Sequence, residues 1–186
     1  MARAMTPALL VGVVAALVGL LRGGSLEALA TTPFKAVPVL FASLFVQVGF
    51  DIWNPEWLSD SGDLAILLLT NAGVAAFLVL NRELPGMMLA AIGMALNVLV
   101  IAANGAMPVS AEAAEAAGLG SIGEVGLKHE LLTDATLLPF LADVIPIPVI
   151  AKIVSLGDLF LGAGIGWLVY RRMTQPAEVS RPAVSD

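Results

Sequence analysis

The chain has 186 residues, of which 59% are hydrophobic and 13% charged, and its mean hydropathy is +0.93. Soluble domains are nearer to about half apolar and about a quarter charged. A chain this short also has too small an interior to hide so many apolar side chains from water. The composition therefore excludes an ordinary soluble domain and predicts an all-α integral membrane protein.

Charge and rare residues exclude further classes. Nine Lys and Arg against 15 Asp and Glu give a net charge of −6, and no basic stretch is suited to nucleic acid. The absence of Cys excludes disulfides and thiolate metal sites, and the single His excludes a His-rich metal centre. No motif assigns a cofactor or a metal. The lipid bilayer is the one partner that the composition implies.

Uncharged runs predict about five membrane-spanning helices. About 20 apolar residues cross a bilayer, and a charge at its centre is costly. Pro7, Pro38 and Pro85 suit the first turns of three of these helices. The predicted spans are residues 4–21, 36–50, 64–81, 84–103 and 153–170, the last containing Asp158.

Residues 135–151 form a further apolar segment with one charge, Asp143. Pro139, Pro146 and Pro148 would break a continuous spanning helix there. We expect a short helix that dips into the membrane or lies on its surface. Residues 1–172 then form a single transmembrane domain, and residues 173–186 a disordered cytoplasmic tail.

The distribution of basic residues predicts the orientation. Cytoplasmic loops are enriched in Lys and Arg, so Arg171 and Arg172 favour a cytoplasmic C-terminus and an outside N-terminus. An alternative makes the first span a signal peptide cleaved near Ala28–Ala30, but cleavage would place the arginine pair outside. The predicted cytoplasmic set is Arg22, Lys35, Arg82, Arg171, Arg172 and Arg181.

Small residues in the last span predict a close helix contact. Gly162 and Gly166 are four residues apart, which is the spacing of closely packed membrane helices. We expect contact with another helix of the same chain, the alternative being a homodimer seam.

Polar residues concentrate on the predicted outer side of the second half of the chain. Ionisable groups at membrane depth are costly and usually face a cavity or a partner. We expect Asn104, Asp143 and Asp158 to line one outward-facing pocket. Their oxygens suit a hard cation, a carboxylate pair can share a proton, and a structural network that ties the loop to the bundle is equally open. The candidate binding residues are Asn97, Asn104, His129, Asp134, Asp143 and Asp158.

Three motifs carry a resemblance to a known family. They are Asn104-Gly105-Ala106-Met107-Pro108, Leu141 to Pro146, and Ser155-Leu156-Gly157-Asp158. With them the chain resembles, from about Leu9 to Leu168, a family of small bacterial multi-pass membrane proteins labelled only as a domain of unknown function. The resemblance implies the bacterial cytoplasmic membrane and supplies no activity.

Three functions remain open on the sequence. The first hypothesis is binding or transport of a small solute, ion or lipid head group at the outer polar pocket. The second is a membrane-embedded enzyme acting on a lipid-linked substrate, with Asp143 or Asp158 as acid–base. The third is an accessory subunit of a larger membrane complex, in a homo- or hetero-oligomer, with the Gly162 and Gly166 face turned outward.

Overall fold

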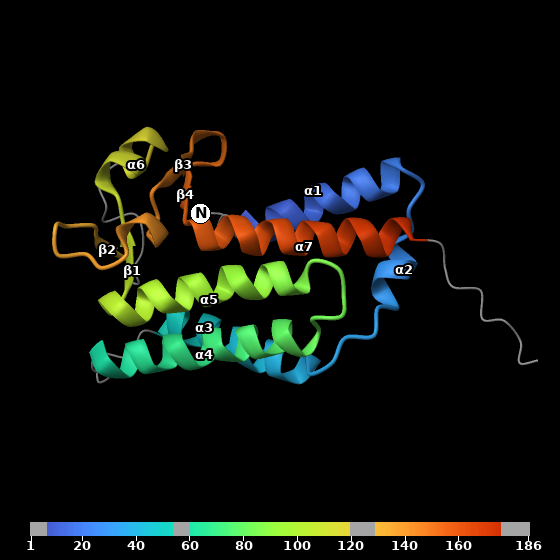
Figure 1. The fold of residues 1–186 in the computed structure, drawn as a ribbon, viewed down its shortest axis with the longest axis horizontal. Coiled ribbons are helices and arrows are strands. Elements are labelled where there is room, and N and C mark those ends of the chain that lie inside the picture. Colours follow the sequence, from blue (N-terminus) through green and yellow to red (C-terminus); the bar gives the residue numbers. More distant parts are fainter. Residues whose placement is uncertain (1–6, 54–59, 120–128, 176–186) are drawn as a thin grey trace, which may run out of the picture.

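Five long helices lie side by side and alternate in direction along the chain (Figure 1). The computed structural model describes residues 7–53, 60–119 and 129–175. The long helices are α1 (Pro7–Leu21), α3 (Val37–Trp53), α4 (Asp60–Leu80), α5 (Met87–Asn104) and α7 (Leu156–Thr174). Their bounds follow the predicted spans to within a few residues, because charges and turn residues limit each apolar run.

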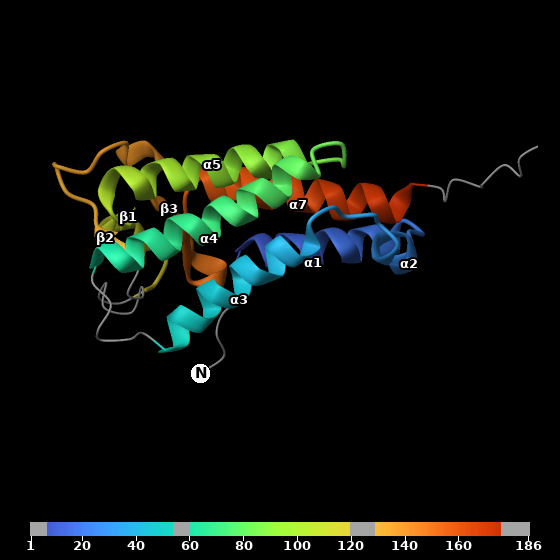
Figure 2. The same ribbon diagram turned by 90° about the horizontal axis from the view of Figure 1, so that it is seen from below.

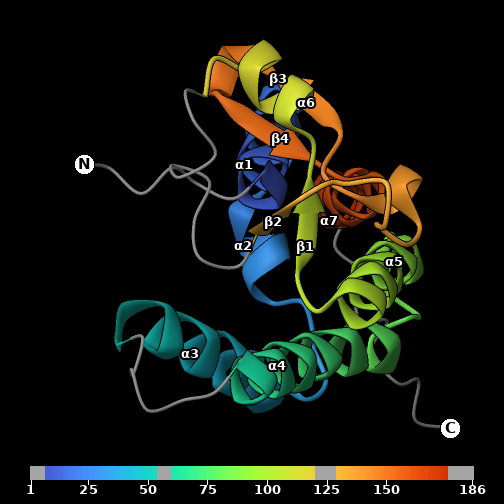
Figure 3. The same cartoon turned by 90° about the vertical axis from the view of Figure 1, so that its left-hand side faces the viewer.

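The last helix in the sequence occupies the centre of the fold. α7 packs between α1 and α5, α4 packs on α5, and α3 packs on α4. Seen from the end of the bundle, the helices follow an open arc in the order α1, α7, α5, α4, α3 (Figure 3). α3 diverges from the other helices (Figure 2). Its side chains Phe41 and Phe45 are 65% and 80% exposed.

Glycines allow α7 to approach two helices at once. A Cβ at Gly164 would lie 2.5 Å from the Ala90 nitrogen and from the Gly86 oxygen of the α5 side. On its other side, Gly162 and Gly166 face Val11 of α1, at 3.4 and 2.9 Å from an added Cβ. The glycine pair is therefore an internal seam, as expected, which counts against an outward-facing glycine surface for a partner subunit. α1 itself packs along α7.

The connection between α5 and α7 folds into a small cap, defined here as the described residues between Gly105 and Ser155. β1 pairs with β2 in parallel, β3 pairs with β4 antiparallel, and Val109 of β1 forms a further parallel bridge with Asp143. Val109, Ala113 and Ile153 belong to the core of the cap. The elements are β1 (Met107–Val109), α6 (Ala111–Ala116), β2 (His129–Leu131), η2 (Pro139–Leu141), β3 (Ile145–Ile147), η3 (Pro148–Ile150) and β4 (Lys152–Val154).

The two ends of the bundle differ in charge. The end opposite the cap carries α2 (Leu26–Ala30), the 81–86 turn and the end of α7 (Figure 1). Its basic residues are Arg22, Lys35, Arg82, Arg171 and Arg172, against Glu27 and Glu83. In the described part of the cap, Lys152 is the one basic residue, against Glu112, Glu115, Glu130, Asp134 and Asp143.

Two helices are long and apolar enough to cross a membrane, namely Ser61–Leu80 of α4 and α5. α1 and Val37–Phe50 of α3 are apolar but shorter, and α7 carries Asp158 and its two arginines. On length and composition, the structure thus supports two of the five predicted spans.

The all-α prediction is wrong in the cap, which contains four short strands. Residues 135–151 form no dipping α-helix, because their prolines limit them to turns, two 3₁₀ turns and β3. The last helix begins at Leu156 and not at 153, since residues 152–154 pair with β3. Met173 and Thr174 belong to α7, and residues 176–186 of the predicted tail lie outside the described residues.

The packing of α7 predicts different effects for an alanine substitution at two of its glycines. Alanine is favoured over glycine in a helix by about 1 kcal/mol, and overpacking costs about 1–3 kcal/mol. Gly164→Ala, whose Cβ meets backbone, should lower the free energy of unfolding by about 1–2 kcal/mol. Gly162→Ala, whose nearest neighbour is a Val11 methyl group at 3.4 Å, should be neutral or stabilising. Thermal unfolding in detergent measures both, and equal effects would contradict this packing.

Candidate functional site

A polar network joins α5 to the start of α7. Asn97 donates from Nδ2 to Asp158 Oδ1 at 2.8 Å, and the Ser155 hydroxyl donates to Asn97 Oδ1 at 2.9 Å. The Asp158 backbone N–H donates to Ser155 Oγ at 3.0 Å, and the Ser155 N–H donates to Asp158 Oδ2 at 3.2 Å. Three side chains from two helices therefore form one closed set of hydrogen bonds.

The local sequence explains this geometry. Ser155 and Asp158 are three residues apart and form a capping box, in which each side chain accepts from the backbone of the other. Gly93 and Gly157 let the two helices meet at this level, since a Cβ on Gly157 would collide with Asn97 Oδ1. Asp158 thus helps to cap the start of α7.

The network places a carboxylate between two apolar helices. Asn97 is 9% exposed, Ser155 is fully buried, and Asp158 is half-buried. The donors that hold the two Asp158 oxygens, an amide and a backbone N–H, are both neutral. They stabilise the carboxylate by hydrogen bonding, and its place in the first turn of α7 adds the favourable field of the helix dipole.

Asn104 anchors the cap to the end of α5. Its Nδ2 donates to the Val100 and Leu137 carbonyls at 2.8 and 2.9 Å, and its Oδ1 accepts from the Leu137 N–H at 2.8 Å. Asn81 does the same at the other end of the bundle, where it binds the N–H and carbonyl of Lys35. Asn104 is therefore engaged with backbone, and its hydrogen bonds fix the 137–141 turn.

Asp143 lies in the cap and is 6% exposed. Its N–H donates to the Pro108 carbonyl at 2.9 Å, and its carbonyl accepts from the Ser110 N–H at 3.0 Å. These bonds extend the parallel pairing of β1. Asp143 and Asp158 are thus held by different elements, the first beside β1 and the second at the start of α7.

The two other candidate residues lie in the cap. His129 begins β2 opposite Met107, and its side chain lies outside the described residues. Asp134 is exposed, in a turn closed by the Thr133 N–H, which donates to Thr136 Oγ1 at 2.8 Å. Of the six candidates, the hydrogen bonds join Asn97 and Asp158 directly.

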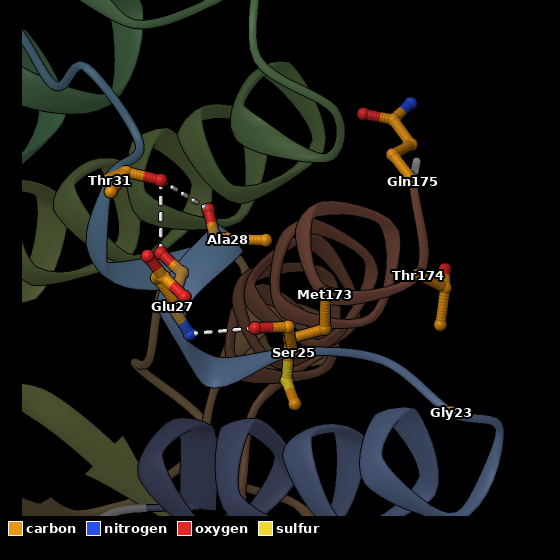
Figure 4. Close-up of a pocket in the computed structure, with 8 residues that line it drawn as sticks. All are labelled: Gly23, Ser25, Glu27, Ala28, Thr31, Met173, Thr174 and Gln175. Atoms are coloured by element: carbon orange, nitrogen blue, oxygen red, sulfur yellow. Dashed lines mark hydrogen bonds between the residues drawn. The ribbon is translucent and has the colours of Figure 1, made fainter. Parts of the chain in front are cut away.

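A hollow of about 460 Å³ lies at the opposite end of the bundle, between α2 and the end of α7 (Figure 4). Ser25, Glu27, Thr31, Thr174 and Gln175 are its polar lining residues. Ser25 caps α2 by accepting from the Glu27 N–H at 3.1 Å, and the Ser25 N–H donates to the Met173 carbonyl at 3.0 Å. The full lining is Gly23, Ser25, Glu27, Ala28, Thr31, Met173, Thr174 and Gln175.

The described residues hold no cluster of metal-ligating side chains. Among residues 7–53, 60–119 and 129–175, His, Asp and Glu side chains form no group of three that could hold a metal ion. An ion at Asp158 would therefore depend on one carboxylate together with amide, hydroxyl and backbone oxygens.

Sequence reasoning missed two parts of this arrangement. Ser155 was not a candidate, although its spacing to Asp158 is a capping signal. The hollow was not predicted, because it joins residues about 150 positions apart in the sequence. Arg172, which donates from Nε to the Thr32 hydroxyl at 3.0 Å, fastens the same two segments.

The fold and the network define a mostly helical protein with two helices able to cross a membrane and a polar contact beneath a folded cap. The chain belongs to the family of unknown function DUF5317, whose family description matches residues 31–170. That match confirms the expected resemblance to a family labelled as a domain of unknown function. No curated protein and no solved structure matches the chain.

A double-mutant cycle tests the network. Asn97→Ala and Asp158→Ala should each destabilise the protein, because each leaves a buried polar partner unsatisfied. The double variant should lose less than the sum, with a coupling free energy of about 0.5–3 kcal/mol from unfolding in detergent. Strictly additive losses would show that the two side chains do not interact.

Proposed function

We propose that this protein crosses the cytoplasmic membrane of a bacterium five times, through α1, α3, α4, α5 and α7. The exposed apolar side chains of these helices support a lipid-facing surface, since soluble proteins rarely expose large apolar areas. Examples are Leu17 at 56%, Phe45 at 80% and Leu69 at 72%. Successive long helices run in opposite directions, as they would if each crossed the same bilayer in turn (Figure 1).

The charge difference between the ends supports an orientation with the N-terminus and cap outside. The five described basic residues of the α2 end suit the cytoplasmic side. Residues 135–151 of the cap then lie at the outer face of the cytoplasmic membrane. Phe140 and Val149 are 66% and 94% exposed there, which suits contact with lipid.

Reporter fusions test this orientation. A green fluorescent protein fused after Asp186 should fluoresce, because it folds in the cytoplasm, and alkaline phosphatase at the same place should be inactive. A cysteine introduced at Asp134, in a chain without other cysteines, should react with an impermeant maleimide in whole cells. Labelling only after lysis would show that the cap faces the cytoplasm and would contradict the proposed orientation.

Within this topology, we propose that the protein binds a small cationic solute, ion or lipid head group at the Asp158 network. One observation carries the proposal: the Asp158 carboxylate lies between two apolar helices with neutral hydrogen-bond donors. A charge at membrane depth is costly unless a counter-charge or proton offsets it. A cation that reaches Asp158 from the cap side would supply this compensation, while Asn97 and Ser155 keep the carboxylate in place.

Cation-dependent stability tests the binding site. In detergent, one of sodium, magnesium or calcium chloride should raise the unfolding temperature above that in choline chloride, because a ligand stabilises the state that binds it. At 100 times the Kd the gain is about 2.7 kcal/mol. Asp158→Asn should abolish the response.

Asp134→Asn is the matched control, since it removes one carboxylate from an exposed turn of the same cap. It should keep the full response to the cation. Equal responses of the wild type and Asp158→Asn would contradict a cation site at this carboxylate.

A further inference from the structure

The hollow at the α2 end is lined by a mixed set of polar groups. Glu27 contributes a carboxylate, Ser25 and Thr31 contribute hydroxyl groups, and Gln175 contributes an amide (Figure 4). The hydroxyl of Thr31 donates to the Glu27 carbonyl at 2.9 Å, which fixes this wall of the hollow. The Glu27 side chain is exposed and acts in none of the bonds that cap α2.

Two arginines flank this hollow. Arg22 directly precedes Gly23 of the lining, at the end of α1. Arg171 is exposed and lies three residues before Thr174 of the lining, which is about one turn of α7. Arg172, on the adjoining face, is held by the Thr32 hydroxyl. The lining itself thus contains the Glu27 carboxylate, and two exposed arginines lie next to lining residues in the sequence.

Neighbouring apolar residues place the hollow at the level of lipid head groups. Trp167 is 52% exposed one turn before Arg171, and aromatic residues of this kind mark the membrane–water boundary. Leu21 and Leu26, on either side of the 22–25 turn, are 87% and 54% exposed. This placement rests on the membrane crossing proposed above, and not on the cation site at Asp158.

We propose that the hollow binds the head group of a phospholipid with a primary ammonium group, of the phosphatidylethanolamine class. The lipid phosphate would lie against the Arg22 and Arg171 guanidinium groups, which pair well with phosphate oxygens. The ammonium group would donate to Glu27 and to the free acceptor positions of the hydroxyl groups. Phosphatidylglycerol offers Glu27 no cation, and the trimethylammonium group of phosphatidylcholine has no N–H to donate.

Native mass spectrometry of the full chain tests this choice. The protein is inserted into nanodiscs of equal phosphatidylethanolamine, phosphatidylglycerol and phosphatidylcholine, and the lipids that stay bound on release are counted by mass. Phosphatidylethanolamine should be retained in preference to the other two. Glu27→Gln should lower that preference by about threefold, the effect of one exposed ion pair, and leave phosphatidylglycerol retention unchanged.

Arginine variants distinguish the head-group site from general charge attraction. Arg171→Gln should reduce retention of phosphatidylethanolamine and phosphatidylglycerol alike. Arg82→Gln is the matched control and should change neither, because Arg82 lies at the 81–86 turn and pairs with Glu83 at 3.5 Å.

Each other outcome overturns the proposal in a distinct way. Preferential retention of phosphatidylglycerol in the wild type would show that the arginines alone select the lipid. An unchanged preference in Glu27→Gln would remove the carboxylate from the site. Failure to enter nanodiscs at all would contradict the membrane crossing as well, whereas entry without any lipid preference would contradict the head-group site alone.

Discussion

The close approach of α7 to two other helices is the constraint on which the rest of this structure depends. Gly164 and Gly157 bring its backbone against α5, while Gly162 and Gly166 bring another face against α1. In lipid there is no hydrophobic force to drive helices together, so such small-residue contacts supply much of the packing. α7 is the last helix of the chain, yet it packs between α1 and α5. The helices that precede it in the sequence therefore surround the position that it fills.

The position of the cap follows from the same constraint. α7 begins at the level of Asn97, so the last two turns of α5 extend beyond it and provide a wall for the cap. Val100 and Ile101 of α5 pack there with Met107 and Leu141. Asn104 fastens the same turn by hydrogen bonds to backbone. The polar network thus lies where helix packing and cap packing meet, and the proposed cation site at Asp158 rests on this position.

The sequence predicts the helices well and their arrangement poorly. Helix limits could be predicted because charges bound the apolar runs. α5 ends where Gly105 adopts the left-handed conformation with φ of 87°, a conformation that glycine favours at helix ends. The strands of the cap were missed because they have three residues each, too few for an alternating pattern, and two contain proline. The helix order was not predictable, since helices that are apolar on all sides do not show which face meets a neighbour. Of the candidate site, the pairing of Asn97 with Asp158 depends on the helix register, which the sequence does not give. The three-residue spacing of Ser155 and Asp158 is itself a helix-capping signal.

Thiol cross-linking in native membranes tests the central position of α7 most directly. The chain has no cysteine, so introduced pairs report without background. A Cβ at Gly12 lies 3.5 Å from the Ile165 side chain, and the pair Gly12→Cys with Ile165→Cys should therefore form a disulfide within one chain under mild oxidation. The pair Gly12→Cys with Phe45→Cys joins α1 to the exposed face of α3 and should remain reduced. A disulfide between α1 and α3, with none between α1 and α7, would contradict the account.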